Sequence, residues 1–224
     1  MNVIVTGANR GIGLELVRQL LAQGHKVEAA CRHPDDAKEL RATGARVHAV
    51  DIIDGKSIAA FVRVLDGTPI DLLINNAGVY GNPRQRLQDF DYAAATHAFE
   101  TNALGALRLS QAFLPHLRRG TGKKLAHISS TMGSIGNTTS AGDLAYRMSK
   151  AALNMMSKSI ALELRDDRII SIVLHPGWVR TAMGGRNAPM LPSESARGIL
   201  EQIAAASFAD SGEFFDFKGN RCSW

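Results

Sequence analysis

Short apolar stretches alternate with longer amphipathic ones from the first residues of the chain. The apolar stretches resemble buried parallel strands, and the longer ones space apolar residues as helices do, for example Ile12, Leu16 and Leu20. The pattern predicts strands at Asn2–Thr6, Lys26–Cys31, Arg46–Val50, Asp71–Asn75, Lys124–Ser129, Ile169–Leu174 and Gly212–Phe217. It predicts helices at Gly11–Gln23, Asp35–Ala42, Lys56–Leu65, Asp91–Arg118, Ala145–Arg165 and Ser193–Ala205.

Strands that alternate with helices indicate βαβ units and a parallel sheet with helices on both faces. Because such crossovers are right-handed, we expect an α/β fold, a Rossmann-type doubly wound parallel sheet in three layers (α/β/α). No internal repeat, low-complexity tract or linker interrupts the 224 residues. We therefore expect a single domain over residues 1–224, with the active site in the same domain.

Composition narrows the class of protein. The formal net charge is +5, but the basic residues are scattered, so a nucleic-acid partner is not expected. No apolar stretch approaches the roughly 20 residues of a membrane span, and the N-terminus does not resemble a signal peptide. The two cysteines, Cys31 and Cys222, and the histidines lack metal-ligand spacing. We expect a cytoplasmic protein with no membrane association and no metal.

A glycine-rich turn follows the first expected strand. Thr6–Gly13 reads TGANRGIG and opens the first expected helix. Glycines at this point let the chain bend tightly, let a pyrophosphate approach the backbone, and let the helix pack closely on the sheet. The spacing differs from the general G-x-G-x-x-G fingerprint. The position between strand and helix nevertheless favours a dinucleotide site over a turn that serves packing alone.

The end of the second expected strand indicates which dinucleotide binds. NAD sites place an acidic residue there, where it binds the ribose 2′-hydroxyl. In this chain Cys31 stands near that place and Arg32 follows it. A guanidinium can bind a 2′-phosphate through two parallel hydrogen bonds, and Arg10 could reach the same phosphate from the turn. We expect NADP(H); the alternative is that both arginines are solvated surface residues.

A tyrosine and a lysine four residues apart, Tyr146 and Lys150, share one face of an expected helix. A free tyrosine has a pKa of about 10, and a neighbouring ammonium favours the phenolate, so the pair could exchange a proton near neutral pH. Ser130, at the end of an expected strand, could donate a hydrogen bond to a substrate oxygen. Tyr-x-x-x-Lys alone is common on helix surfaces, but beside the glycine turn it predicts an active site.

Six motifs in order over nearly the whole chain resemble the short-chain dehydrogenase/reductase family, and especially its small single-domain NADP-dependent carbonyl reductases. They are TGANRGIG at Thr6–Gly13, NNAG at Asn75–Gly78, TNALG at Thr101–Gly105, ISS at Ile128–Ser130, YRMSK at Tyr146–Lys150 and HPGWVRT at His175–Thr181. The resemblance implies an oxidoreductase that transfers hydride reversibly between NADP(H) and a small carbonyl or alcohol substrate. The carbonyl would be a ketone, an aldehyde or a quinone.

The resemblance also implies a role for each matching residue. Tyr146 would give its proton to the carbonyl oxygen, and Lys150 would bind the nicotinamide ribose and lower the pKa of the tyrosine. Ser130 would orient the carbonyl, and Asn102 would hold the water of a proton relay. The implied cofactor-binding residues are Gly7, Asn9, Arg10, Gly11, Ile12, Gly13, Arg32, Asp51, Ile52, Asn76, Ala77, Gly78, Tyr146, Lys150, Pro176, Gly177, Val179 and Thr181.

Two segments depart from the family pattern. Ser130 stands sixteen residues before Tyr146, three more than is commonest in the family, so Ser134 is an alternative to Ser130. Met183–Leu191 is short where many relatives carry a longer lid, which suggests an open, permissive pocket. Four side chains are candidates to line that pocket, although core packing explains each equally well: Tyr80, Met132, Trp178 and Met183.

Two further interpretations complete the expectations. An NADP-bound regulatory or signalling protein with little turnover is the alternative to an enzyme, although all four catalytic positions are filled. Members of the family often pair through their two long helices, here Asp91–Arg118 and Ala145–Arg165. We therefore expect a homo-oligomer, with a dimer favoured. His175 is expected to be a packed, hydrogen-bonded side chain rather than a base.

Overall fold

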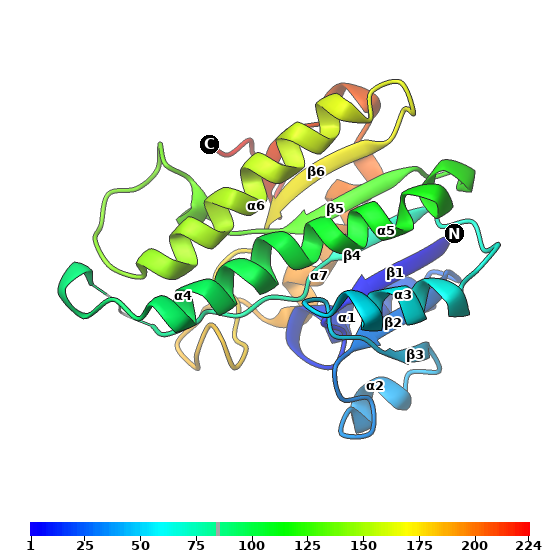
Figure 1. Ribbon diagram of the computed structural model, residues 1–224, viewed down its shortest axis with the longest axis horizontal. Helices are drawn as coiled ribbons and strands as arrows, with labels where there is room; N and C mark the ends of the chain where they lie inside the picture. Colours follow the sequence, from blue (N-terminus) through cyan, green and yellow to red (C-terminus); the bar gives the residue numbers. More distant parts are fainter. Residues whose placement is uncertain (84–85) are drawn as a thin grey trace.

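The computed structural model describes residues 1–83 and 86–224, and over these residues the chain forms a parallel sheet with helices on both faces (Figure 1). The strands are β1 (Asn2–Thr6), β2 (Lys26–Cys31), β3 (Arg46–Ala49), β4 (Leu72–Asn75), β5 (Lys124–Ile128), β6 (Ile170–His175) and β7 (Phe214–Asp216). Their order across the sheet is β3-β2-β1-β4-β5-β6-β7. This is the expected Rossmann-type doubly wound sheet in three layers, and the prediction is confirmed.

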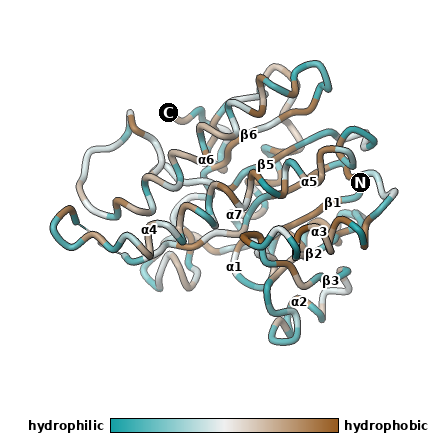
Figure 2. The backbone as a smooth tube through the Cα atoms, in the orientation of Figure 1, coloured by the Kyte–Doolittle hydropathy of each residue, from teal (hydrophilic) through white to brown (hydrophobic). Residues whose placement is uncertain are grey.

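The two faces of the sheet are covered by different helices. These are α1 (Gly11–Ala22), α2 (Lys38–Arg41), α3 (Gly55–Val64), α4 (Tyr92–Phe99), α5 (Gly105–Arg119), α6 (Leu144–Glu163) and α7 (Pro192–Ala205). Because successive strand residues point to opposite faces, Val3 and Val5 join the core beneath α1 and α7. Ile4 joins the core beneath α3, α5 and α6. Figure 2 shows the hydrophobic positions running along β1 inside the molecule.

The long helix expected at Asp91–Arg118 is divided. A π-helical turn at Glu100–Leu104 separates α4 from α5, and the buried Asn102 lies within this turn. A π-turn places an extra residue in the helix and is frequent at functional sites. The apolar periodicity continues across the segment, so the sequence pattern gave no sign of the interruption.

Other boundaries lie within two residues of the expected ones, apart from the helix expected at Asp35–Ala42. There the chain first makes a turn, in which the Ala37 N–H donates to the Pro34 carbonyl at 3.1 Å, and only α2 remains helical. Short 3₁₀ helices at Leu87–Asp89, Thr131–Gly133 and Phe208–Asp210 were not predicted. Among the described residues no helix combines the length and the apolar composition that crossing a membrane requires.

The amino ends of the central strands are held by one carboxylate. Asp71 accepts hydrogen bonds from the backbone N–H groups of Asn2 at 2.7 Å, Thr121 at 2.8 Å and Gly122 at 3.1 Å. Asp71 immediately precedes β4, and its partners lie at the starts of β1 and β5. The polar groups of the amino edge are therefore satisfied within the protein, and the segments that follow β4, β5 and β6 extend beyond the opposite, carboxyl edge (Figure 1).

Candidate active site

The glycine turn lies where the strand order of the sheet reverses, between β1 and β4. In open α/β sheets this is the point at which ligands bind. The Asn76 amide donates hydrogen bonds to the carbonyl oxygens of Thr6 at 2.8 Å and Gly7 at 3.2 Å. The Thr6 hydroxyl accepts from the N–H groups of Asn76 and Ala77, each at 3.0 Å. These bonds fix the ends of the two central strands to each other.

The glycines of the turn stand where a side chain cannot fit. A Cβ on Gly13 would lie 2.3 Å from the Gly7 carbonyl oxygen and 2.5 Å from the Asn76 amide nitrogen. Gly7 and Gly11 have φ values of +62° and +58°, in the left-handed region that favours glycine. Arg10, the N-cap of α1, makes no side-chain cap, so the first N–H groups of the helix remain for a ligand. The residues present therefore fit a dinucleotide pyrophosphate.

Two exposed arginines flank this turn. The Ala8 N–H donates to the Ala30 carbonyl at 3.2 Å, which brings the turn against the end of β2, just before Arg32. Arg10 and Arg32 are both exposed, as is Asn9. Within the described part of the chain neither guanidinium belongs to an ion pair. The arrangement leaves both charges available to a phosphate.

The residues that are expected to bind the adenine of the cofactor make hydrogen bonds or packing contacts within the protein. The Asp51 carboxylate accepts from the Ile53 N–H at 3.1 Å, and the Asp51 N–H donates to the Ser57 hydroxyl at 2.9 Å. The Ile52 side chain is buried and lies against Gly105, where a Cβ would come within 2.8 Å of it. Packing against the core explains why the Ile52 side chain is buried, so contact with a nucleotide would involve the Ile52 backbone.

Ser130, Tyr146 and Lys150 lie together at the carboxyl edge of the sheet. The Ser130 hydroxyl lies close enough to Tyr146 to oppose the rise in the pKa of that phenol. The Lys150 ammonium donates to the Ile128 carbonyl at 2.8 Å and lies 5.8 Å from the centroid of the Tyr146 ring. Ser134, the alternative to Ser130, instead accepts from the Asn137 N–H at 3.1 Å within its own loop. The structure thus brings Ser130, and not Ser134, to the tyrosine.

Asn102 is held by the segment that follows the NNAG motif. Its amide oxygen accepts from the Val79 N–H at 2.8 Å, and its amide nitrogen donates to the Val79 carbonyl at 2.8 Å and the Ser149 hydroxyl at 2.9 Å. Ser149 in turn donates to the Tyr146 carbonyl at 2.8 Å. Because the Asn102 side chain has these partners, a relay water bound at Asn102 would use its backbone carbonyl.

Burial decides the pKa values of the two titrating groups. Burial lowers the pKa of Lys150 to about 8. Burial raises the pKa of Tyr146 above its usual value, the neighbouring Tyr80 adds to this, and the Ser130 hydroxyl opposes it. The net shift of the Tyr146 pKa is opposite to the lowering expected from Lys150, because desolvation of the phenolate is the largest effect. In this environment Tyr146 is a protonated phenol, the form that can donate a proton to a carbonyl oxygen.

The segment that follows β6 returns to the glycine turn. The Thr181 methyl group lies 3.2 Å from where a Cβ on Gly11 would stand, and the Thr181 hydroxyl accepts from the Gly184 N–H at 3.0 Å. The Pro176 carbonyl accepts from the Ser195 hydroxyl at 2.7 Å, which fastens the segment to α7. Of the expected nicotinamide segment, which comprises Pro176, Gly177, Val179 and Thr181, the contacts therefore place Thr181 beside the turn.

His175 supports the backbone beside Ser130. Its Nδ1 accepts a hydrogen bond from the Thr131 N–H at 3.3 Å. Burial lowers the pKa of His175 to about 4, and the Asp216 carboxylate opposes the shift. A neutral imidazole that accepts from the backbone agrees with the expectation of a packed side chain.

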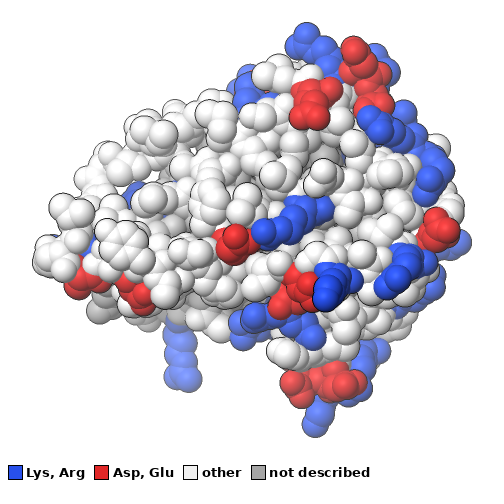
Figure 3. Space-filling model, viewed as in Figure 1, with Lys and Arg blue, Asp and Glu red and all other residues white. Residues whose placement is uncertain are grey.

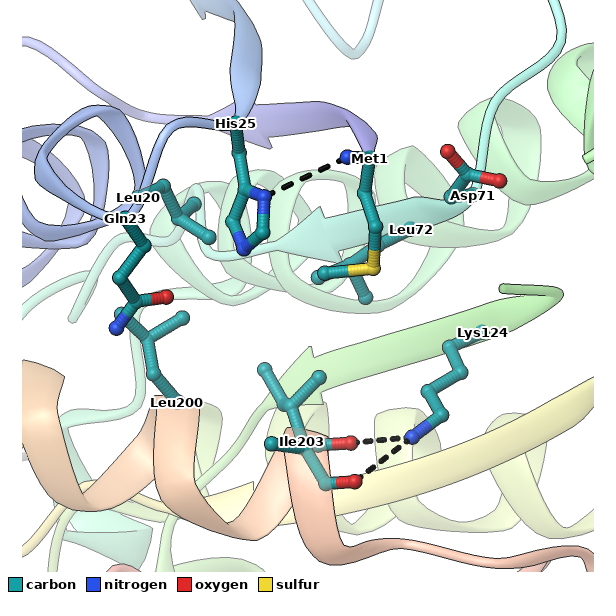
Figure 4. A pocket seen from close by; sticks show the side chains of 10 residues that line it. Met1, Leu20, Gln23, His25, Asp71, Leu72, Lys124, Leu200 and Ile203 are labelled. Carbon is teal, nitrogen blue, oxygen red and sulfur yellow. Dashed lines mark hydrogen bonds between the residues drawn. The ribbon is translucent and has the colours of Figure 1, made fainter. Parts of the chain in front are cut away.

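A cavity of about 260 Å³ lies at the other edge of the sheet, away from Tyr146 (Figure 4). It is lined by residues at the amino ends of the strands, among them Met1, His25, Asp71 and Lys124. Lys124 donates to the Ile203 carbonyl at 2.6 Å, so its ammonium neutralises the end of α7. The expected catalytic side chains do not line this cavity, which belongs to the supporting structure.

Sequence reasoning missed two residues that contribute to the site and one contact. Thr6 and Ser149 stand inside recognised motifs, but their role is to bond neighbouring segments, and this becomes visible only once those segments are placed. Tyr80 was expected as a candidate to line the pocket, but its stacking on Tyr146, with ring centroids 4.4 Å apart, was not. The sequence signal for that contact is the place of Tyr80 directly after NNAG and Val79.

Comparison with known proteins identifies the family. Residues 1–191 match the short chain dehydrogenase family, and the chain belongs to it. The chain is 47% identical over 165 residues to the C-signal protein of Myxococcus xanthus, covering 74% of this chain and 99% of that protein. It is 33% identical over 229 residues to the 1-hydroxy-2-glutathionyl-2-methyl-3-butene dehydrogenase of Rhodococcus sp. (strain AD45), covering 99% of each.

Among solved structures, the NADPH-bound carbonyl reductase from chicken fatty liver matches with a TM-score of 0.92. The two chains are 35% identical, and the match covers 100% of this chain and 98% of that one. The expected family resemblance is confirmed, as is the expectation of NADP(H) as the cofactor that accompanies this fold in its solved neighbours. Oxidoreduction is the activity of the family.

The glycine turn yields the first testable prediction. Replacing Gly13 with alanine places a methyl group against the Gly7 carbonyl and the Asn76 amide. This overpacking should cost about 1–3 kcal/mol of stability and weaken NADPH binding about tenfold or more. Fluorescence titration with NADPH and thermal unfolding measure both effects.

Gly55 provides the matched control, because it begins α3 and a Cβ there meets nothing within 4 Å. Gly55→Ala should leave NADPH affinity unchanged. Equal affinities of Gly13→Ala and wild type for NADPH would contradict a nucleotide site at this turn.

Proposed function

We propose that this chain is an NADPH-dependent carbonyl reductase, which transfers hydride reversibly between NADP(H) and a ketone, aldehyde or quinone. The observation that carries the proposal is the grouping of Ser130 and Tyr146 beside the buried Lys150, at the sheet edge that also holds the glycine turn. The cofactor and substrate sites share one sheet, as in a single domain.

Each catalytic residue has a task that its surroundings support. Bound NADPH supplies the hydride. The Ser130 hydroxyl orients the carbonyl oxygen, and Tyr146, protonated in its buried site, donates the proton to that oxygen. Lys150, fixed by the Ile128 carbonyl, stabilises the phenolate that remains and binds the nicotinamide ribose. The backbone carbonyl of Asn102 holds the water that restores the proton.

The cofactor site is assigned to segments that converge on the glycine turn. The turn and the start of α1 would hold the pyrophosphate, Arg10 and Arg32 the 2′-phosphate, and Asp51 and Ile52 the adenine. The ribose and nicotinamide would contact residues from three segments: Asn76, Ala77, Gly78, Tyr146, Lys150, Pro176, Gly177, Val179 and Thr181. The NADPH-bound carbonyl reductase of similar fold supports this choice of cofactor.

Tyr146→Phe tests the proton donor. It removes one hydroxyl and should lower carbonyl reduction by about 100- to 10,000-fold, while NADPH binding stays close to that of wild type. The measurement is NADPH consumption against a panel of ketones, aldehydes and quinones, with NADPH titration alongside. Tyr92→Phe, at an exposed tyrosine on α4, is the control and should keep full activity.

The second candidate function is an NADP-bound regulatory or signalling protein with little turnover. The 47% identity to the C-signal protein of Myxococcus xanthus favours keeping it. The same panel separates the two candidates. If wild type binds NADPH tightly and reduces no member of the panel, the signalling function replaces the reductase.

Arg32→Asp tests the choice between NADPH and NADH. Loss of a hydrogen bond to a charged group costs about 1.5–3 kcal/mol, which corresponds to a loss of NADPH affinity of about 10- to 100-fold. NADH, which lacks the 2′-phosphate, should bind as well as before. Arg63→Asp makes the same charge change on the exposed side of α3 and should affect neither cofactor. Equal losses for NADPH and NADH in Arg32→Asp would contradict the assignment.

We also propose that two copies pair through the face formed by α4, α5 and α6. Met148, Met155 and Leu162 are exposed at intervals of seven residues along α6, so they form one apolar stripe. Exposed apolar side chains on the neighbouring helices extend it: Tyr92, Phe99 and Leu107. Figure 3 shows few charged side chains over α4 and the adjoining part of α6 on this face. A second copy of the same face is its natural partner.

Light scattering tests this pairing. Wild type should have the mass of a dimer, and Met155→Asp should shift it to a monomer because a carboxylate would be buried at the centre of the interface. Val64→Asp changes an equally exposed apolar residue on α3 and should leave the dimer intact. A wild type that is monomeric at micromolar concentration would overturn the proposal.

The reducing environment of the cytoplasm is the setting that we propose for the reaction. Cys31 and Cys222 both carry free thiols, and the first is buried. Burial raises the pKa of each thiol, to about 11 for Cys222, which disfavours the reactive thiolate.

A further inference from the structure

Tyr80 covers one face of the tyrosine that donates the proton. The two rings are stacked, with centroids 4.4 Å apart and planes inclined by 15°. Tyr80 is half-buried and comes from the loop after β4, whereas Tyr146 lies in the first turn of α6. A substrate carbonyl that reaches the Tyr146 hydroxyl must therefore pass beside the Tyr80 ring.

The Tyr80 hydroxyl is held by two further segments. It donates to the Met132 sulfur at 3.7 Å, in the 3₁₀ turn after Ser130, and it lies close enough to the Asp143 carboxylate for that charge to raise the Tyr80 pKa. Burial raises the pKa of Tyr80 and the Asp143 carboxylate adds to this, so the hydroxyl remains a donor. The side chain is fixed at its ring and at its hydroxyl, and it does not swing freely as an exposed loop tyrosine would.

Asp143, which lies near the Tyr80 hydroxyl, has an unusual conformation for the start of a helix. It occupies the N-cap of α6, where aspartate commonly accepts a hydrogen bond from the helix backbone, yet it makes no such bond. Its backbone is left-handed, with φ of 56° and ψ of 34°, a conformation that non-glycine residues keep only where their surroundings enforce it. Arg147 helps to enforce it by donating to the Gly142 carbonyl at 3.0 Å.

These contacts explain what the longer loop before Tyr146 does. The loop brings Asp143 beside the Tyr80 hydroxyl, and the Asp143 side chain does not cap α6. An aromatic ring held in this way is a rigid boundary, because displacing it would break the ring stack and the contact with Met132 together. It stands beside the hydroxyl groups of Ser130 and Tyr146, where the carbonyl must bind.

We propose that Tyr80 is a specificity-determining residue, a fixed aromatic wall that limits the size of the carbonyl substituent lying on its side of Tyr146. The proposal rests on the proposed reductase function. The two parts of the side chain have different tasks. The ring excludes large substituents of the carbonyl substrate, and the hydroxyl, which lies near Asp143, helps to keep the ring in place.

The test compares Tyr80→Ala, Tyr80→Phe and wild type on aryl ketones whose alkyl group grows from methyl to tert-butyl. For each ketone, kcat/KM is measured, together with ketone binding to the NADPH-loaded enzyme by quenching of nucleotide fluorescence. Tyr80→Ala should raise the ratio of the value for the tert-butyl ketone to the value for the methyl ketone at least tenfold, both for kcat/KM and for binding affinity. Tyr80→Phe keeps the ring and should change the ratio less than threefold.

Val64→Ala, at an exposed side chain on α3 outside the proposed dimer face, is the control and should leave the ratio unchanged. If Tyr80→Ala lowers kcat/KM and binding affinity by the same factor for every ketone, the proposal is overturned, since Tyr80 would then be only structural. Failure of the proposed function has a different signature, namely NADPH binding without turnover by wild type. In that case the measurement of ketone binding still tests whether Tyr80 limits substituent size. An equal ratio of tert-butyl to methyl ketone affinity in wild type and Tyr80→Ala would overturn the proposal.

Discussion

The polar junction between Thr6 and Asn76 organises the rest of the structure. It joins the ends of β1 and β4, the two strands at which the sheet order reverses, and it fixes the backbone oxygens against which Gly13 is packed. From this junction the chain continues to Gly78, which lies within reach of Asn102 and Lys150. The cofactor turn and the catalytic group are therefore positioned by the same few hydrogen bonds.

Burial gives the candidate site its chemical character. The same desolvation that lowers the pKa of Lys150 to about 8 raises the pKa of Tyr146, so near neutral pH a charged ammonium faces a neutral phenol. A buried phenolate is stabilised only when positive charge or hydrogen bonds surround it, and Lys150 is the neighbouring group that carries positive charge.

The sequence predicted the fold because strand and helix periodicities differ strongly and alternate regularly. It also predicted that Tyr146 and Lys150 lie together on one helix, because they stand in a motif of fixed spacing, YRMSK. It could not predict the π-turn around Asn102, since one added residue barely changes an apolar pattern. Nor could it predict the contact of Tyr80 with Asp143 or the direction of the Tyr146 pKa shift, which depend on loops that meet only in three dimensions.

The carboxylate of Asp71 has a consequence for how this chain can evolve. It ties the starts of β1, β4 and β5 at the edge of the sheet away from the loops that surround Tyr146. One end of the strands is thus held by hydrogen bonds, and the candidate active site lies at the other. Loops at the carboxyl edge can exchange residues, lengthen or shorten while the framework stays folded, so new substrates are accessible by local change.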